Sequence, residues 1–293
     1  MKSKAKMNLW PALFIGPHML LFLVFFLAPA IIGIYVSFTH WDLYNSPVFT
    51  GLDNYKTILF DKTSIYHTQF MNGMKNTLLF VLFSVPGCII IPLLLAVGLH
   101  AKPKFNRTFQ SILYLPTLFA ISAVMIIWSF LQSRSFGPIR ALFGVDINFA
   151  GTQPWAWILL VLVTIWWTSG GNLIIYVAAL NGVAKEQLEA ADLDGANAVV
   201  KFFKIVLPNI RNQLIFTTVM TTIAQFNIYG QPLMLTQGGP NNSTRVLMMY
   251  IQENAFGSSD SYAGISSAMA ILLGLAIMVV SVIQFVIMRR LEK

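Results

Sequence analysis

The stretch WAWILLVLVTIWWTSGGNLIIYVAALN, residues Trp155–Asn181, contains no Asp, Glu, Lys or Arg. A helix needs about 20 mostly apolar residues to cross the hydrocarbon core of a bilayer, so this run predicts a membrane-spanning helix. Five further stretches are as apolar and also lack all four charged residue types. The six expected spans are Ala12–Phe38, Asn76–Leu99, Phe109–Leu131, Trp155–Asn181, Gln213–Thr236 and Tyr262–Met288.

The composition of the whole chain predicts an all-α membrane protein. Of its 293 residues, 56% are hydrophobic and 10% are charged, whereas a soluble domain carries about 25% charged residues. These charges are too few to cover a soluble surface. The single cysteine, Cys88, can form neither an internal disulfide nor a thiolate metal site, and we expect it to be a small buried apolar residue.

The first stretch also has features of a signal peptide. It follows three lysines, and Ala28-Pro29-Ala30 resembles a small-residue cleavage site. Its apolar run, however, continues to Val36 and is too long for the apolar region of a signal peptide. We therefore expect an uncleaved first span.

The distribution of positive charge predicts the orientation. Of the 19 Lys and Arg residues, 13 fall on the side that holds both termini and six on the other. Cytoplasmic loops carry the excess of Lys and Arg, so both termini are expected in the cytoplasm. The net charge of +8 is then a topology signal, and nucleic-acid binding is not needed to explain it. The 13 inner residues are Lys2, Lys4, Lys6, Lys102, Lys104, Arg107, Lys185, Lys201, Lys204, Arg211, Arg289, Arg290 and Lys293.

Helix-breaking residues are frequent within the spans. We expect them to interrupt the second span and to split the fourth, so that the helices approach closely or enclose a cavity. The alternative is ordinary membrane-helix composition, in which Gly and Pro are common. These residues are Pro86, Gly87, Pro92, Pro116, Gly170, Gly171, Gly230 and Pro232.

The segment Gly182–Arg211 is too polar to span a membrane. Glu186, Glu189 and Asp192 are spaced at three residues, so they share one face of a short predicted helix. Ala190 and Ala191 are small enough for close docking against a partner, and Gly195 can take the left-handed conformation that ends a helix. An interfacial connector without a partner remains the alternative.

The pattern E-A-A-x3-G-x9-I-x-L-P, from Glu189 to Pro208, resembles the cytoplasmic loop of permease subunits of binding-protein-dependent ABC importers. Four other segments resemble the carbohydrate branch of that family, the relatives of the maltose and glycerol-phosphate permease subunits. They are Phe49–Tyr55, Tyr114–Pro116, Ser135–Gly137 and Leu235–Pro240.

This resemblance implies a type I ABC importer-like permease fold with six spans, in the cytoplasmic membrane of a bacterium. It implies a tail 1–11, a membrane domain 12–288 that includes a coupling loop 182–211, and a tail 289–293. Glu186, Glu189, Ala190, Ala191, Asp192 and Gly195 would then form a coupling helix that sits in a cleft of an ATPase subunit.

The same resemblance implies the partners: a second homologous permease, two ATP-binding subunits, an extracytoplasmic solute-binding protein, a sugar and membrane lipid. The chain has no G-x4-G-K-[ST] motif to cradle the phosphates of ATP. We therefore expect a transport subunit that is not itself an enzyme, has no cofactor, and relies on ATP bound by a partner.

A path for solute needs polar groups on apolar helices. Residues at helical spacing offer aromatic, hydroxyl and amide groups, which suit a neutral polyol. The alternative is that Thr and Gln join helices to one another. The candidates are Thr117 on the third span, Thr164, Trp167, Thr168 and Gly171 on the fourth, and Thr221, Gln225 and Tyr229 on the fifth.

The sequence lacks the features that two rival functions would need. An ion-coupled transporter or channel usually keeps an ionisable residue within a span, and none of the six contains Asp, Glu, Lys or Arg. A membrane enzyme would need a catalytic motif, and neither H-E-x-x-H nor G-x-S-x-G occurs.

The outer loop Gln237–Ser261 is expected either to contact a substrate-delivery protein or to cap the bundle.

Overall fold

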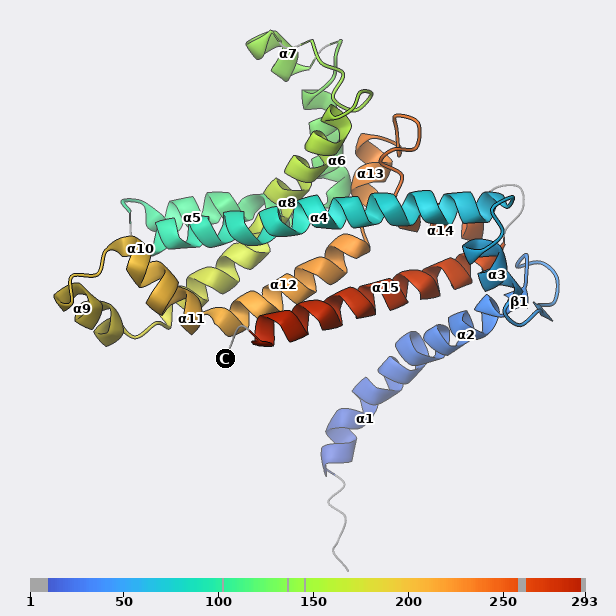
Figure 1. Cartoon of the computed structure of the whole chain (residues 1–293), viewed down its shortest axis with the longest axis horizontal. Helices are drawn as coiled ribbons and strands as arrows, with labels where there is room; N and C mark the ends of the chain where they lie inside the picture. The colour runs from blue at the N-terminus through green and yellow to red at the C-terminus, as the bar shows by residue number, and fades with distance from the viewer. Residues whose placement is uncertain (1–9, 102, 136, 145, 258–261, 291–293) are drawn as a thin grey trace, which may run out of the picture. The chain divides into compact units, whose positions relative to one another are not determined.

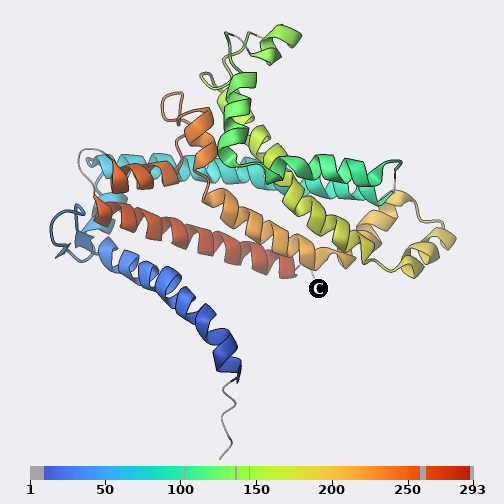
Figure 2. The same cartoon turned by 180° about the vertical axis from the view of Figure 1, so that it is seen from behind.

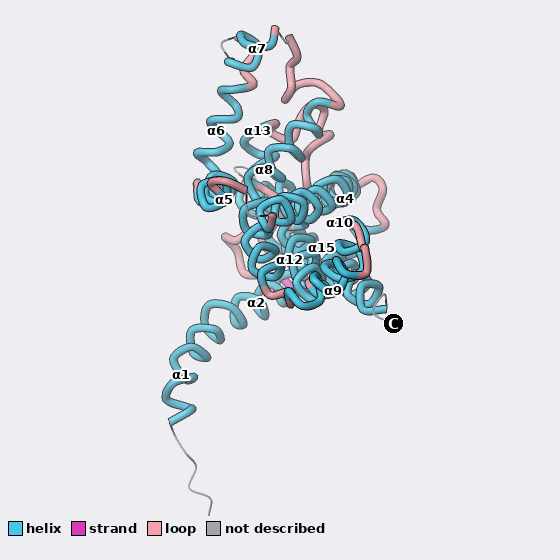
Figure 3. Tube along the Cα trace, turned by 90° about the vertical axis from the view of Figure 1, so that its left-hand side faces the viewer, coloured by secondary structure: helices cyan, strands magenta, loops and turns pink. Residues whose placement is uncertain are grey.

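The computed structural model describes residues 10–101, 103–135, 137–144, 146–257 and 262–290, which are mostly helical (Figure 3). They belong to two compact units, Met1–Thr68 with Ile251–Leu272, and Gln69–Tyr250 with Leu273–Lys293. Several residues used in the sequence analysis lie outside the described residues. They are Lys2, Lys4, Lys6, Lys102, Phe136 and Lys293, together with most of both predicted tails.

The first unit begins with a continuous apolar helical run. α1 (Trp10–Phe22), the π-helical η1 (Leu23–Leu27) and α2 (Ala28–Ser37) follow one another directly. Pro29 has no N–H, so the carbonyl of Phe25, four residues earlier, lacks its usual helical donor. That carbonyl lies in η1, where the wider turn accommodates the proline.

The loop after this run is short and tightly hydrogen-bonded. β1 (Thr39–His40) pairs antiparallel with β2 (Val48–Phe49), and α3 (Asp53–Leu59) follows. The amide of Asn54 donates to the carbonyls of Ser37 (2.9 Å) and Thr39 (2.8 Å). These bonds fix α3 against the end of α2, so the predicted segment Phe49–Tyr55 has a structural role here.

The second unit is built around long helices (Figure 1). α4 (Ile65–His100) begins in the first unit and is followed by α5 (Asn106–Tyr114), the 3-10 helix η2 (Leu115–Leu118), α6 (Ile121–Leu131), α7 (Pro138–Phe143) and α8 (Trp155–Asn181). After α8 come α9 (Lys185–Leu193), α10 (Ala198–Lys201), the π-helical η3 (Phe202–Val206) and α11 (Leu207–Asn209). The remaining helices are α12 (Arg211–Phe226), α13 (Gly230–Leu235), α14 (Leu247–Phe256) and α15 (Ala263–Arg290).

Two apolar clusters stabilise the second unit. One joins α4, α6 and α8 through Phe80, Met125 and Leu160, which are fully buried. The other joins the C-terminal ends of α4 and α8 through residues such as Ala96 and Tyr176. Close van der Waals packing of these side chains holds the helices together where they face one another rather than lipid.

The described residues contain four helices long and apolar enough to cross a membrane: Leu13–Ser37, Ile65–His100, Trp155–Asn181 and Ala263–Arg290. A fifth candidate is the pair Asn106–Leu118 and Ile121–Leu131, which is bent by 99°. Figure 2 shows α6, in green, turning sharply away from α5. The expected fourth span matches α8 residue for residue.

The expected fifth span corresponds to α12 and α13, separated by Asn227–Tyr229. α12 has 16 residues and is about 24 Å long at 1.5 Å per residue, shorter than a hydrocarbon core of about 30 Å. The arrangement of six spans with cytoplasmic termini therefore remains a prediction, supported here by four or five candidate spans.

Two expectations about helix breakers were wrong. α4 runs through Pro86 and Pro92 without interruption, and α8 runs through Gly170 and Gly171. A proline inside a membrane helix is tolerated when another group pairs with the carbonyl that it leaves without a donor. For Pro92 that group is the side chain of Asn172, as described below.

Candidate functional site

The segment Gly182–Arg211 folds into a helical hairpin at the end of α8 (Figure 1). α9 ends as the sequence predicted, since Gly195 has a φ of +74°. The N–H of Gly195 donates to the carbonyl of Asp192, and that of Ala196 to the carbonyl of Ala191. This pair of bonds is the Schellman arrangement, which requires a left-handed residue at the position of Gly195.

The acidic face of α9 is divided between two environments. Glu186 and Glu189 are exposed, and no described residue forms an ion pair with either of them. Asp192 instead pairs with Lys201 of α10. Two carboxylates therefore remain available to a partner, while the third braces the hairpin.

The alanines of α9 also differ in exposure. Ala190 is exposed, whereas Ala191 is buried. Leu188 packs with residues of η3 against the apolar cluster at the ends of α4 and α8. A further hydrogen bond of 2.9 Å joins the side chains of Asn209 and Gln187. α9 is thus fixed to the membrane helices by packing and by two polar contacts.

Three polar pairs run along α8 and α12, which lie antiparallel (Figure 2). Tyr176 bonds Thr217 (2.7 Å), and the amide of Asn172 donates to the hydroxyl of Thr221 (3.0 Å). The third pair, Thr168 and Gln225, meets through the sulfur of Cys88 on α4, at 3.5 and 3.8 Å. The structure thus brings together three predicted path residues, and Thr221 and Gln225 are buried in this contact.

A second group of predicted path residues lies where η2 meets α8. Thr117 donates to the carbonyl of Trp167 (2.9 Å), and the indole of Trp167 donates to the carbonyl of Phe119 (3.2 Å). Gly170 permits this approach, because a Cβ there would lie 2.4 Å from the Thr117 hydroxyl. Gly170 was not among the predicted site residues, although it stands next to one of them.

The remaining predicted path residues are more scattered. Thr164 is fully buried and donates to the carbonyl of Leu160 in its own helix. Gly171 faces open space, since a Cβ there would meet no atom within 4 Å. Tyr229 precedes α13 and packs, with Trp167, against the α4–α6–α8 cluster. Trp167 and Tyr229 are partly exposed.

The sequence analysis missed Asn172, Tyr176 and Thr217. A signal for them existed, because residues 164, 168, 172 and 176 repeat at exact intervals of four in α8, and Thr217 continues the Thr221–Gln225 spacing in α12. Steps of four residues follow one ridge of a helix. In α8 the predicted set instead followed mixed spacings of three and four, and in α12 it began one turn too late, at Thr221.

These features match one known family. A model of the binding-protein-dependent transport system inner membrane component family matches residues 66–293. The chain belongs to this family. It is therefore a multi-pass membrane subunit of a transport system, and the permease is not an enzyme.

Curated relatives cover nearly the whole permease. It is 32% identical to the probable starch degradation products transport system permease protein AmyD of Thermoanaerobacterium thermosulfurigenes, over 100% of this chain and 99% of the relative. It is 31% identical to the arabinooligosaccharides transport system permease protein AraP of Bacillus subtilis, over 93% of this chain and 86% of the relative. Both relatives are sugar transport permeases.

A solved structure shares the fold of the permease. It is a bacterial alginate ABC transporter in complex with an alginate pentasaccharide-bound periplasmic protein. The TM-score is 0.83 at 23% identity, and the match covers 98% of this chain and 96% of the other. The likeness establishes a shared permease fold.

The loop of the permease after α13 is anchored to α4. The amide of Asn76 donates to the carbonyls of Asn242 and Arg245, each at 2.9 Å. The hydroxyl of Thr77 accepts from the N–H of Leu247 (3.0 Å). Within this part of the chain, the segment that follows Gln237 is therefore fixed to α4, and its role as a cap or as a contact for a delivery protein stays a prediction.

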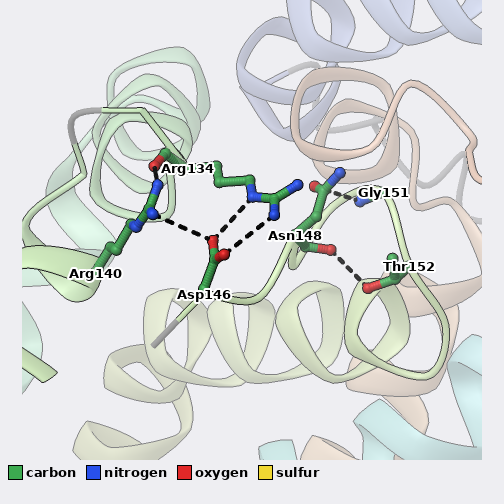
Figure 4. Close-up of polar contacts among 6 residues, drawn as sticks. All are labelled: Arg134, Arg140, Asp146, Asn148, Gly151 and Thr152. Atoms are coloured by element: carbon green, nitrogen blue, oxygen red, sulfur yellow. Dashed lines mark hydrogen bonds and ion pairs between the residues drawn. The ribbon is translucent and has the colours of Figure 1, made fainter. Parts of the chain in front are cut away.

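A second segment of the permease, between α6 and α8, is organised by charge. Arg134 donates its Nε and Nη2 to the two carboxylate oxygens of Asp146, at 2.9 and 3.1 Å, and Arg140 approaches the same carboxylate at 3.7 Å (Figure 4). The hydrogen bonds from Arg134 lower the pKa of Asp146, and burial opposes them. The carboxylate therefore stays ionised at neutral pH and loses this pairing only as the pH falls through its lowered pKa.

Proposed function

We propose that this permease forms half of the membrane pathway of an ATP-driven importer for a sugar or a related neutral polyol. The observation that carries the proposal is the folded hairpin 182–211, in which α9 presents Glu186 and Glu189 outward while its other side is fixed to the membrane helices. A connector that only crossed the interface would not need such bracing. The sugar relatives support the class of substrate.

The proposed assembly has four kinds of partner. A second homologous permease completes the pathway, two ATPase subunits supply the energy, and an extracytoplasmic binding protein delivers the solute. The chain lacks a P-loop motif, which is consistent with ATP bound by another subunit. The alginate transporter that shares the fold was solved with a periplasmic protein, which supports a delivery partner.

We assign the contact with the ATPase to α9, with Glu189 at its centre and Glu186, Ala190, Ala191, Asp192 and Gly195 shaping the helix. Glu189→Lys is expected to reduce both uptake and co-purification with the ATPase subunit by at least about tenfold. If Glu189 faces a basic residue in the ATPase cleft, as the family resemblance implies, the lysine places like charges across the interface, which costs several kcal/mol. Glu189→Gln removes the charge without reversing it and should have a smaller effect. Full assembly and full uptake in Glu189→Lys would contradict this assignment.

We assign solute contact to the face that carries Thr117, Trp167, Thr168, Gly171 and Tyr229, with Thr164, Thr221 and Gln225 behind it. Trp167→Ala should raise the sugar concentration for half-maximal uptake by about tenfold through lost ring stacking. Trp166 is a matched control, since its ring packs edge-on against Trp128 at 5.7 Å. An unchanged half-maximal concentration in Trp167→Ala would leave Trp167 as a packing residue.

The proposed topology places α9 in the cytoplasm and the segment after α13 outside. Single cysteines at Asp53, Lys204 and Gln237 test it, because native Cys88 is only 1% exposed and should not react. A membrane-impermeant thiol reagent is expected to label the first and third in intact cells, and the second only after lysis. Labelling of Lys204→Cys in sealed cells would overturn the orientation.

A further inference from the structure

The three polar pairs between α8 and α12 keep one register. From Tyr176–Thr217 to Asn172–Thr221 and on to Thr168 with Gln225, each step of four residues down α8 matches a step of four up α12. Two antiparallel helices keep such a register only if their facing ridges lie alongside each other through the whole contact. The pairs therefore form one ladder rather than three separate contacts.

Asn172 ties this ladder to a third helix. Pro92 has no N–H, so the carbonyl of Cys88, four residues earlier in α4, has no helical donor. The amide of Asn172 donates to that carbonyl at 2.9 Å and also to Thr221 at 3.0 Å. One side chain thus pairs with α4 at the place where α4 needs a donor and with α12 at the middle of the ladder.

The cytoplasmic end of the ladder joins the hairpin. Tyr176, in the last pair, is fully buried in the cluster that contains Leu93, Leu180 and Ile210 and that receives Leu188 of α9. Asn209, two residues before α12, bonds Gln187 of α9. A displacement of α9 is therefore applied to the ends of α4, α8 and α12 together.

We propose that α4, α8 and α12 move as one body during transport, with Asn172 as the positioning residue that joins them, so that motion of α9 reaches the solute face undiminished. This inference rests on the proposed function, because it assigns a route for the coupling described there. It also gives a physical reason for an asparagine in the middle of the apolar helix α8.

The measurement is the ratio of ATP hydrolysed to sugar imported by the complete transporter in proteoliposomes. Asn172→Leu is expected to raise that ratio by about tenfold, a typical size for a coupling change. Thr217→Val should raise this ratio less. Thr217→Ser keeps the hydroxyl and should leave the ratio at that of the unmodified transporter. Thr218→Val is the control, because Thr218 lies next to the ladder but in none of its pairs.

A second variant separates folding from coupling. Pro92→Ala returns a helical N–H to the Cys88 carbonyl, so Asn172→Leu with Pro92→Ala should regain the folded yield while keeping the raised ratio. If the ratio also returned to that of the unmodified transporter, Asn172 would only satisfy α4, and the inference would be overturned. An unchanged ratio in both Asn172→Leu and Thr217→Val would overturn it as well.

Spin labels test the rigid body directly. Cysteines at Ile174 on α8 and Met220 on α12 lie on exposed positions, 38% and 51%, and the distance between their labels should stay the same with and without ATP. A change in that distance would overturn the proposal. Failure of the proposed function looks different, since the unmodified transporter would then import no sugar at all.

Discussion

Gly195→Val is expected to abolish uptake, with a loss greater than that of any charge substitution on α9. The φ of +74° at Gly195 lies in the left-handed region, where a β-branched residue is strongly disfavoured. Relief of that strain would break the two hydrogen bonds that end α9 and would turn the helix away from the apolar cluster that it packs against. Uptake and co-purification with the ATPase subunit measure the result.

Gly144→Val is the matched control for this prediction. Gly144 has a φ of +64° and, like Gly195, has no atom within 4 Å of an added Cβ. The two substitutions impose similar backbone strain. Gly144, however, ends α7, which comes before α8 in the sequence, whereas the hairpin comes after α8. Equal losses of uptake in both variants would show that strain alone, rather than the orientation of α9, causes the defect.

Gly170→Val is expected to destabilise the second unit. An added Cβ would lie 2.4 Å from the hydroxyl of Thr117 and 3.0 Å from the Cα of Tyr114. The second of these atoms is backbone at the end of α5 and cannot rotate away, so α8 must separate from α5 and from η2, which follows it. Overpacking of this kind costs about 1–3 kcal/mol and should lower the midpoint of thermal unfolding by about 5 °C.

The neighbouring glycine provides the comparison for this stability measurement. Gly171 has open space where its Cβ would lie, so Gly171→Ala should leave the midpoint of thermal unfolding unchanged or slightly raised, because alanine favours the helix. Thermal unfolding of the purified chain in detergent gives both values. Equal midpoints for Gly170→Val and the unmodified chain would show that η2 does not pack closely on α8.

Local sequence determined the elements whose cause lies within a few residues. The charge-free run from Trp155 to Asn181 predicted α8 with its true bounds, because every residue in it favours lipid or a neighbouring helix. Gly195 was predicted to end a helix, and it does, because only a residue without Cβ takes that conformation at little cost. The pattern from Glu189 to Pro208, which contains Gly195, also indicated the family.

Tertiary structure decided the features that depend on distant partners. α4 begins at Ile65 rather than near Asn76, since Asn72 and Asn76 hydrogen-bond to the loop around Asn242. The N-terminal turns of α4 are too polar to look like a membrane span in a hydropathy pattern, yet the loop accepts hydrogen bonds from their side chains. No local sequence pattern predicts a hydrogen-bonding partner so far away in the chain.

The proline in α4 shows the same division between local and distant causes. By itself Pro92 predicts an interruption, because it removes a hydrogen-bond donor from the helix. Asn172, 80 positions later in the chain, supplies the missing donor to the carbonyl of Cys88 at 2.9 Å, and the helix continues. The sequence determined that a carbonyl would lack its partner, and only the packing of α8 against α4 decided which side chain would pair with it.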